Sequence, residues 1–111
     1  MFGRLSLIAL LLTGGCSSRD EELAAAKGAR SALAEWSAVE RLDGARRLPA
    51  AYAGVMRDKA REALLSDRKS IKDAEAGRTV DSVIDAAAPG APALTAAGAR
   101  LQQAVDRLEA R

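Results

Sequence analysis

Apolar residues recur every three or four positions along most of this chain, and this spacing is the feature that most limits its possible folds. Such spacing places apolar side chains on one face of an α-helix. Alanine and charged residues are frequent, whereas strand-forming residues gather only between Val80 and Ile84. The sequence therefore predicts an all-α fold, a small bundle or hairpin of three to four amphipathic helices.

Glycine, proline and polar residues divide the chain into four expected helices. Gly44 and Gly77 are the expected stops of the first two helices, because glycine readily adopts the backbone conformation that ends a helix. Pro49 suits the first position of the second helix, and Thr79 suits the N-cap of the third. The expected bounds are about 20–43, 49–76, a short helix between Thr79 and Pro89, and about 93–111.

The apolar stripes of these helices give a candidate core, which is thin because most of its members are alanine. In the last helix three leucines repeat every seven residues, so this helix either docks on the preceding helices or self-associates, and two heptads favour docking. The candidate core residues are Leu23, Ala26, Ala29, Leu33, Trp36, Val39, Leu42, Tyr52, Val55, Met56, Ala60, Ala63, Leu64, Ile71, Ala74, Val80, Val83, Ile84, Ala87, Leu94, Ala97, Leu101, Ala104, Val105 and Leu108.

Residue counts exclude several functional classes. The chain has one cysteine and no histidine, so it cannot form an internal disulfide, a histidine-based metal site, a Ser-His triad or a Cys-His dyad. Its 17 Lys and Arg residues nearly balance 15 Asp and Glu residues, for a net charge of +2, which is unlike a nucleic-acid-binding surface. We expect no cofactor, no metal and no nucleic-acid partner.

The N-terminal segment is typical of a secretory signal. Arg4 supplies a positive charge, the run from Leu5 to Leu12 is almost wholly apolar, and small residues follow it. A permanent membrane span needs about 20 apolar residues, so this run is too short to be a transmembrane helix. The sole cysteine, Cys16, directly follows Gly14 and Gly15 where the apolar run stops.

The segment Leu12-Thr13-Gly14-Gly15-Cys16 resembles the lipobox of bacterial lipoproteins, with Thr13 where leucine is usual. The resemblance implies cleavage between Gly15 and Cys16 and a covalent lipid, with fatty chains such as palmitate, on the Cys16 sulfur. An ordinary leader or a free cysteine is the alternative. Ser17, rather than aspartate, follows the cysteine, which by the same resemblance implies the outer membrane, facing the periplasm.

This resemblance gives the expected organisation of the chain. Residues 1–15 form the lipoprotein signal peptide, 16–20 a flexible lipidated tether, and 21–111 the helical domain. Two or three acyl chains on one residue make detachment from a membrane negligible, since one chain alone already gives measurable, reversible binding. The lipid therefore anchors the chain without spanning the bilayer.

Two groups of charged residues are candidates for a chemical site. Glu35 and Glu40 flank Trp36 and could act as a glycosidase pair, but five positions separate them on a helix and Trp36 belongs to the apolar stripe. The cations between Arg57 and Lys72 could bind lipid phosphates, lipopolysaccharide or peptidoglycan. Acidic residues are interleaved with them, which favours an ordinary solvated helix face.

The expected function is a structural or protein-interaction role for a small outer-membrane lipoprotein that is not an enzyme. An envelope protein or peptidoglycan is its expected partner, besides the membrane. One alternative is a prophage lysis lipoprotein, the outer-membrane half of a spanin pair, although the chain lacks the proline-rich stretch common after the lipobox of those proteins. A cell-wall-active enzyme or its accessory is the weaker alternative.

Overall fold

The computed structural model describes residues 18–111, and these residues form an all-α bundle. Of the described residues 83% are helical and none lies in a strand, which confirms the predicted fold class. The part of the chain that carries Gly15 and Cys16 lies outside the described residues. The helices are α2 (Ser18–Gly44), α3 (Ala50–Arg68), α4 (Ala74–Asp85) and α5 (Ala91–Ala110).

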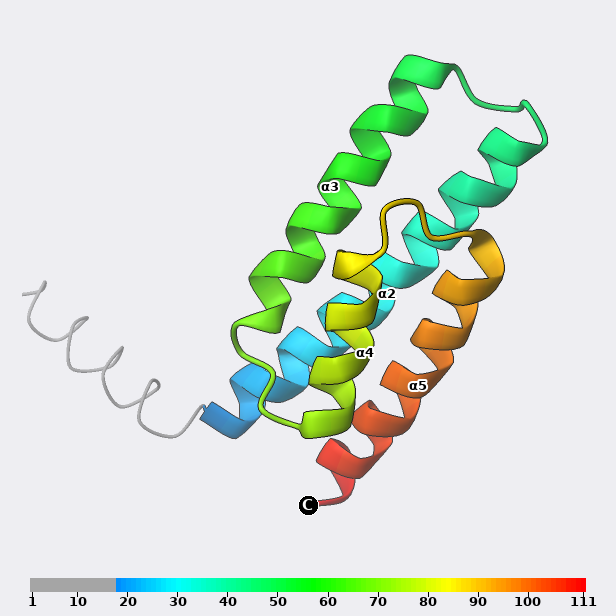
Figure 1. Cartoon of the computed structure of the whole chain (residues 1–111). Helices are drawn as coiled ribbons and strands as arrows, with labels where there is room; N and C mark the ends of the chain where they lie inside the picture. Colours follow the sequence, from blue (N-terminus) through cyan, green and yellow to red (C-terminus); the bar gives the residue numbers. More distant parts are fainter. Residues whose placement is uncertain (1–17) are drawn as a thin grey trace, which may run out of the picture.

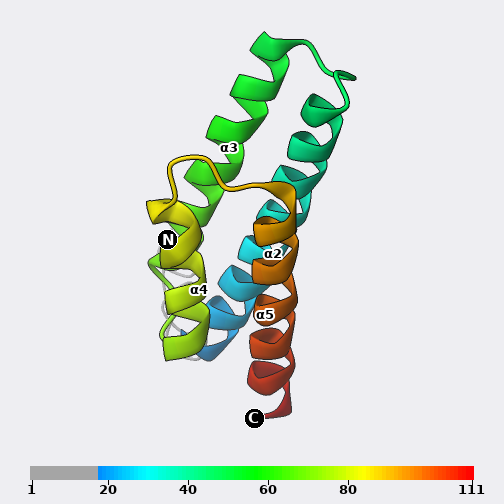
Figure 2. The same ribbon diagram turned by 45° about the vertical axis from the view of Figure 1, so that its right-hand side comes forward.

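The longest helix, α2, organises the bundle because both α3 and α5 pack along it. The short helix α4 packs against α3 and α5 and is the fourth helix of the bundle (Figures 1 and 2). The start of α2 and the end of α5 lie at one end of the molecule, and the α2–α3 connection stands at the other end, beyond the α4–α5 loop. The bundle is elongated, with extents of 56 × 32 × 20 Å.

The core combines large leucines with alanines that let the helices approach closely. Leu33 of α2, Leu64 of α3, and Leu94 and Leu101 of α5 are fully buried together, next to Val80 of α4. Since the heptad leucines of α5, including Leu108, are buried inside the bundle, docking rather than self-association is their role. Within the described helices, none is long and apolar enough to cross a membrane.

The predicted end of the second helix was wrong, because the helix stops at Arg68 and the chain turns there instead of continuing as a helix to Ala76. Asp73 is the N-cap of α4, and its carboxylate accepts a hydrogen bond from the backbone N–H of Ala76 at 3.0 Å. The break lets α4 fold back onto α5. The expected caps Gly77 and Thr79 are instead buried positions within α4, and the Thr79 hydroxyl donates to the Glu75 carbonyl.

The end of α2 is also set by the turn that follows it rather than by Gly44, which is the last helical residue. Arg46 has a φ of 58°, in the left-handed region that usually holds glycine. The N–H of Arg46 donates to the Asp43 carbonyl and that of Arg47 donates to the Leu42 carbonyl. These two bonds are those of a Schellman motif, with arginine at its left-handed position.

Five residues of the candidate core are exposed: the small Ala74 and Ala87 and three larger residues. Tyr52 and Val55 in α3 are each 52% exposed, and Leu42 near the end of α2 is 39% exposed. The prediction failed because the α2–α3 hairpin extends past the rest of the bundle, so no other helix covers these side chains (Figure 1). The helix α3 buries Ala53, Ala60 and Leu64 instead.

Candidate functional site

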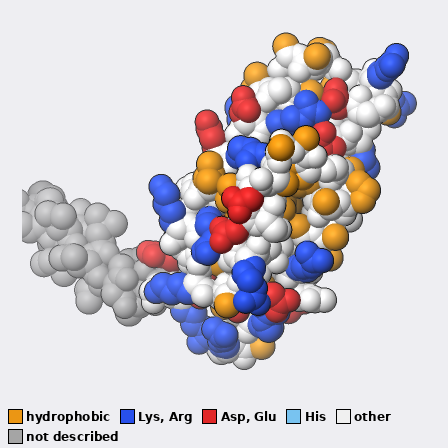
Figure 3. Space-filling model, in the orientation of Figure 1, with side chains coloured by type: hydrophobic (Ala, Val, Ile, Leu, Met, Phe, Trp, Pro, Cys, Tyr) orange, Lys and Arg blue, Asp and Glu red, His pale blue; other side chains and the backbone are white. Residues whose placement is uncertain are grey.

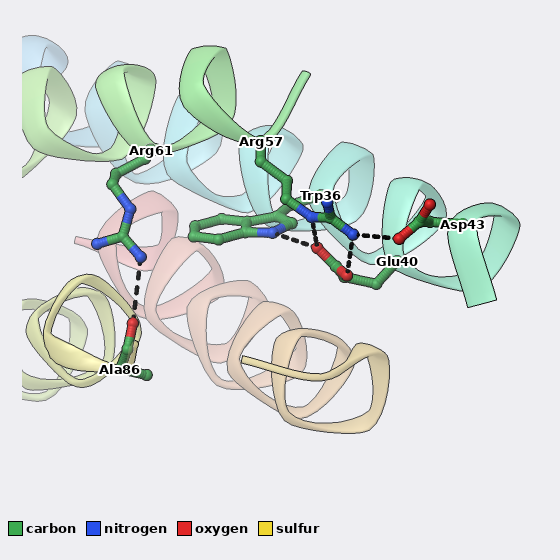
Figure 4. Close-up of polar contacts among 6 residues, drawn as sticks. All are labelled: Trp36, Glu40, Asp43, Arg57, Arg61 and Ala86. Carbon is green, nitrogen blue, oxygen red and sulfur yellow. Dashed lines mark hydrogen bonds and ion pairs between the residues drawn. The ribbon is translucent and has the colours of Figure 1, made fainter. Parts of the chain in front are cut away.

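An open hollow lies where α2, α3 and the α4–α5 loop meet. Its volume is about 420 Å³, and it is lined by Trp36 and Glu40 of α2, residues 57, 58 and 61 of α3, and loop residues 87–90. Figure 4 shows its polar side chains in a row beneath α3. The hollow is open to solvent on one side and carries charged groups of both signs.

A chain of polar contacts joins α2 to α3 along one wall of this hollow. The Arg57 guanidinium donates from Nε and Nη2 to the two oxygens of Glu40, at 2.6 and 2.9 Å, and Nη2 also reaches Asp43 at 2.5 Å. The indole N–H of Trp36 donates to the same Glu40 carboxylate at 2.9 Å (Figure 4). These contacts are short and charge-assisted, which makes them stronger than neutral hydrogen bonds.

Arg61 occupies the other wall and links three elements. Its guanidinium carbon lies 5.2 Å from the ring centroid of Trp36, a cation–π geometry. Its two terminal nitrogens donate to the carbonyls of Ile84 and Ala86 at 2.5 and 3.1 Å, where α4 ends. Arg61 therefore satisfies carbonyls that the last turn of a helix leaves without a partner.

The electrostatics of Glu40 oppose a role as a catalytic acid. The hydrogen bond from Arg57 lowers the pKa of Glu40 below its ordinary value, aided by the Trp36 indole. A glycosidase acid needs a raised pKa so that it is protonated when the bond breaks. Glu35, the other candidate, is exposed and has no hydrogen bond to Trp36 or Glu40. The structure therefore does not bring the two carboxylates together as a pair.

The basic stretch from Arg57 to Lys72 divides into two sets. The three arginines turn inward: Arg68 binds the Asp81 carboxylate of α4 at 2.8 Å and donates to the Ile71 carbonyl, as Arg57 and Arg61 bind partners of their own. The lysines at 59, 69 and 72 are exposed and make no ion pair with a described residue. Only the lysines fit the expected solvated face, while the arginines hold the bundle together.

A smaller hollow of about 270 Å³ lies between α2 and α5. Ser37 and Thr95 share a hydrogen bond of 2.9 Å across it, and Arg30 donates to Gln102 at 2.6 Å. Arg41 also lines this hollow, at the end nearest the α2–α3 turn. Its polar groups bridge the two helices.

Sequence reasoning missed two structural roles. Glu22 is only 7% exposed, and its carboxylate binds the chain at the α3–α4 break. The sequence could have indicated this role, because Glu22 is an acidic residue on the face of α2 that is buried. The inward arginines also had a signal, because Arg57, Arg61 and Arg68 share one helical stripe with Leu64.

Among residues 18–111 no cluster of acidic residues, histidines or cysteines could hold a metal ion. Every fully buried side-chain nitrogen or oxygen in this part of the chain has a hydrogen-bond partner. The predicted lipidation and cleavage residues, Cys16 and Gly15, precede the described residues. The chain matches no protein family, and no curated protein or solved structure is significantly similar to it.

Proposed function

We propose that this chain is a lipid-anchored protein of the bacterial cell envelope with a non-catalytic, structural or protein-interaction role. The observation that carries the proposal is the position of Cys16. It is the sole cysteine, it directly follows Gly14 and Gly15 at the end of the apolar run, and it lies two residues before α2 begins at Ser18. The lipid on Cys16 would attach a four-helix body to the surface of a membrane.

The fold of the described residues is compatible with such a body. The helices enclose a shared core of leucine, valine and alanine, and the charged residues bridge helices rather than gather into a reaction centre. Arg57 lowers the pKa of Glu40, a carboxylate that lines the hollow between α2, α3 and the α4–α5 loop, and so favours its ionised form. This supports a binding or structural role over the weaker alternative of a wall-degrading enzyme.

Metabolic labelling with a fatty acid tests the anchor directly. We expect the full chain expressed in a two-membrane bacterium to incorporate the label and to fractionate with membranes. A Cys16→Ala variant should do neither, while Ser18→Ala serves as a neighbouring control that keeps both properties. An unmodified thiol on the purified wild-type product, or a retained Met1, would overturn the proposal.

The choice of membrane has its own test. Ser17 follows the cysteine, and by resemblance to known lipoproteins an aspartate there favours retention in the inner membrane. Density separation of the two membranes should place the wild-type chain in the outer membrane and a Ser17→Asp variant in the inner one. If both variants enter the same fraction, the outer-membrane part of the proposal fails and lipidation stands.

A further inference from the structure

We infer that the end of the α2–α3 hairpin, residues 41–55, is a second membrane-contact site that binds an anionic phospholipid surface. This part of the molecule, here called the hairpin tip, stands beyond the α4–α5 loop and is covered by no other helix (Figures 1 and 2). It is the end of the molecule farthest from Ser18 and from the predicted anchor. The inference does not depend on lipidation of Cys16.

The hairpin tip exposes apolar side chains that a monomeric bundle would ordinarily cover. Tyr52 and Val55, one helical turn apart in α3, each leave 52% of their surface in solvent, and Leu42 leaves 39%. In Figure 3 a few separate apolar side chains are visible at the upper end of the molecule, over the start of α3. Tyrosine with aliphatic neighbours is the composition that favours the interface of a bilayer.

The hairpin tip also contains three arginines. Arg41, Arg46 and Arg47 are exposed, and none of their guanidinium groups forms a hydrogen bond or ion pair within residues 18–111. The nearby acid Asp43 is already bound to Arg57. With Asp43 counted, residues 41–55 carry a net charge of +2, which complements anionic lipid headgroups.

The backbone at Arg46 supports a selected role for that charge. Its φ of 58° would cost a glycine nothing, but costs a residue with a Cβ about 1 kcal/mol or more. A chain that needed only a helix stop would be more stable with glycine there. An exposed arginine without a partner, held at a strained position, indicates that the side chain acts on something outside the bundle.

A lipid surface fits these features better than a second protein does. A stable protein interface buries about 800 Å² on each partner, which a few half-exposed side chains on a narrow turn do not reach. Neither of the two hollows described above is lined by Leu42, Tyr52 or Val55. Shallow apolar groups with flexible cations around them suit a headgroup layer, which adapts to the shape of the protein.

Fluorescence at the hairpin tip tests the inference in the full chain. A Cys16→Ser background with Ala51→Cys carries one environment-sensitive dye, and Ala99→Cys, on α5, is the matched control position. We expect the dye at residue 51 to shift to the blue with vesicles of phosphatidylcholine and phosphatidylglycerol, and not with phosphatidylcholine alone. The dye at residue 99 should not respond to the anionic lipid, and added salt should reverse the shift.

Two pairs of variants separate the contributions of charge and apolar surface. Arg46→Gln with Arg47→Gln should weaken the response roughly 30-fold, because each basic residue near an anionic surface contributes about fivefold. Arg78→Gln with Arg100→Gln removes the same charge elsewhere and should change it little. Tyr52→Ser should weaken it more than Leu65→Ser, which alters an exposed leucine outside the tip.

Three outcomes would overturn the inference. One is a blue shift of equal size with neutral and anionic vesicles. Another is an equal weakening of the lipid response by the Arg46/Arg47 pair of substitutions and by the Arg78/Arg100 pair. The third is a response that follows protein concentration without lipid, which would identify a second copy as the occupant. Because Cys16 is absent from all these variants, none of these results bears on the proposed lipid anchor.

Discussion

Glu22, at the start of α2, accepts a hydrogen bond of 2.6 Å from the backbone N–H of Asp73, the residue that caps α4. The same carboxylate oxygen also accepts from the N–H of Lys72 at 2.5 Å. One buried side chain thus binds the backbone at the break between α3 and α4, fifty residues away along the chain. This contact helps to hold α4 in place, because turn hydrogen bonds of the backbone extend only as far as the Ile71 N–H, which donates to the Arg68 carbonyl at 3.2 Å.

Replacing Glu22 by alanine should therefore destabilise the whole bundle. It would remove the acceptor of the Lys72 and Asp73 backbone N–H groups, and losing a part-buried hydrogen bond to a charged group costs about 1–3 kcal/mol. Glu22→Gln keeps one acceptor oxygen and should cost less. Urea unfolding followed by circular dichroism measures both variants, and equal stability of Glu22→Ala and wild type would contradict the assigned role.

Arg61 should contribute to stability through α4 and through Trp36. In Arg61→Ala the carbonyls of Ile84 and Ala86 lose their donor and the Trp36 ring loses its cation, so we expect a loss of about 1–3 kcal/mol. Trp36 is the only tryptophan and is 3% exposed, so its emission should move to longer wavelength as the site opens. Lys59→Ala, an exposed neighbour on α3, is the control and should leave both measurements unchanged.

Arg46→Gly should stabilise the protein, in contrast to most substitutions. Glycine removes the strain of the left-handed position, and we expect a gain of about 1 kcal/mol in the free energy of unfolding. Ala45→Gly, at the preceding residue, is the control and should give no gain. If the hairpin tip binds lipid, Arg46→Gly should also weaken vesicle binding, so stability and binding would change in opposite directions.

Asp67 should make the protein less stable as the pH rises. Burial beside Gly28 of α2 raises the pKa of this carboxyl above its ordinary value of 3.8. The folded state then holds the proton more tightly than the unfolded state, so stability falls as the pH rises from about 3.8 through the folded pKa. Asp67→Asn should be more stable at neutral pH, by less than about 1 kcal/mol because the group is partly solvated. Below the ordinary pKa the difference should vanish.

Asp73 should show the opposite pH dependence. The hydrogen bond from the Ala76 N–H lowers its pKa, and an ion pair with Arg107 at 2.9 Å adds to the effect. Its stabilisation is present above the ordinary pKa of 3.8 and is lost as the pH falls through the lower folded pKa. Asp73→Asn keeps the cap but loses the ion pair, so it should be less stable at neutral pH and equal to wild type in acid. Asp73→Ala should cost about 0.5–2 kcal/mol more, because it also removes the cap.

The sequence pattern was sufficient for the fold class and for most of the core. The stripes through Leu33, Leu64, Leu94 and Leu101 are buried as predicted, since the period of a helix determines which side chains share a face. The same reasoning failed at Tyr52, whose stripe is correct for a helix but lies on a part of α3 that no third helix covers. Periodicity identifies the apolar face of a helix, but not whether a neighbour reaches it.

The sequence indicates the break after Arg68 and the polar contacts between Glu40 and Arg57 less clearly. Lys69 and Asp73 have the spacing of an ion pair within one helix, and this concealed the N-cap role of Asp73. One contact at this break is tertiary, because Glu22 of α2 accepts from the backbone N–H groups of Lys72 and Asp73, and a local one adds to it, because Arg68 donates to the Ile71 carbonyl. The contacts of Glu40 with Arg57 likewise join two helices, so no pattern within a single helix could predict them.

The positions of Ser18 and of the C-terminal Arg111 have a practical consequence for experiments in cells. Ser18 and Arg111 lie at the same end of the bundle, and α2 separates them from the hairpin tip by about 40 Å of helix. A fluorescent protein or affinity tag fused after Arg111 would therefore lie beside the end where we propose the lipid anchor and would leave the tip unobstructed. An insertion in the α2–α3 turn would do the reverse, so the two tagged forms can report separately on anchoring and on contacts at the tip.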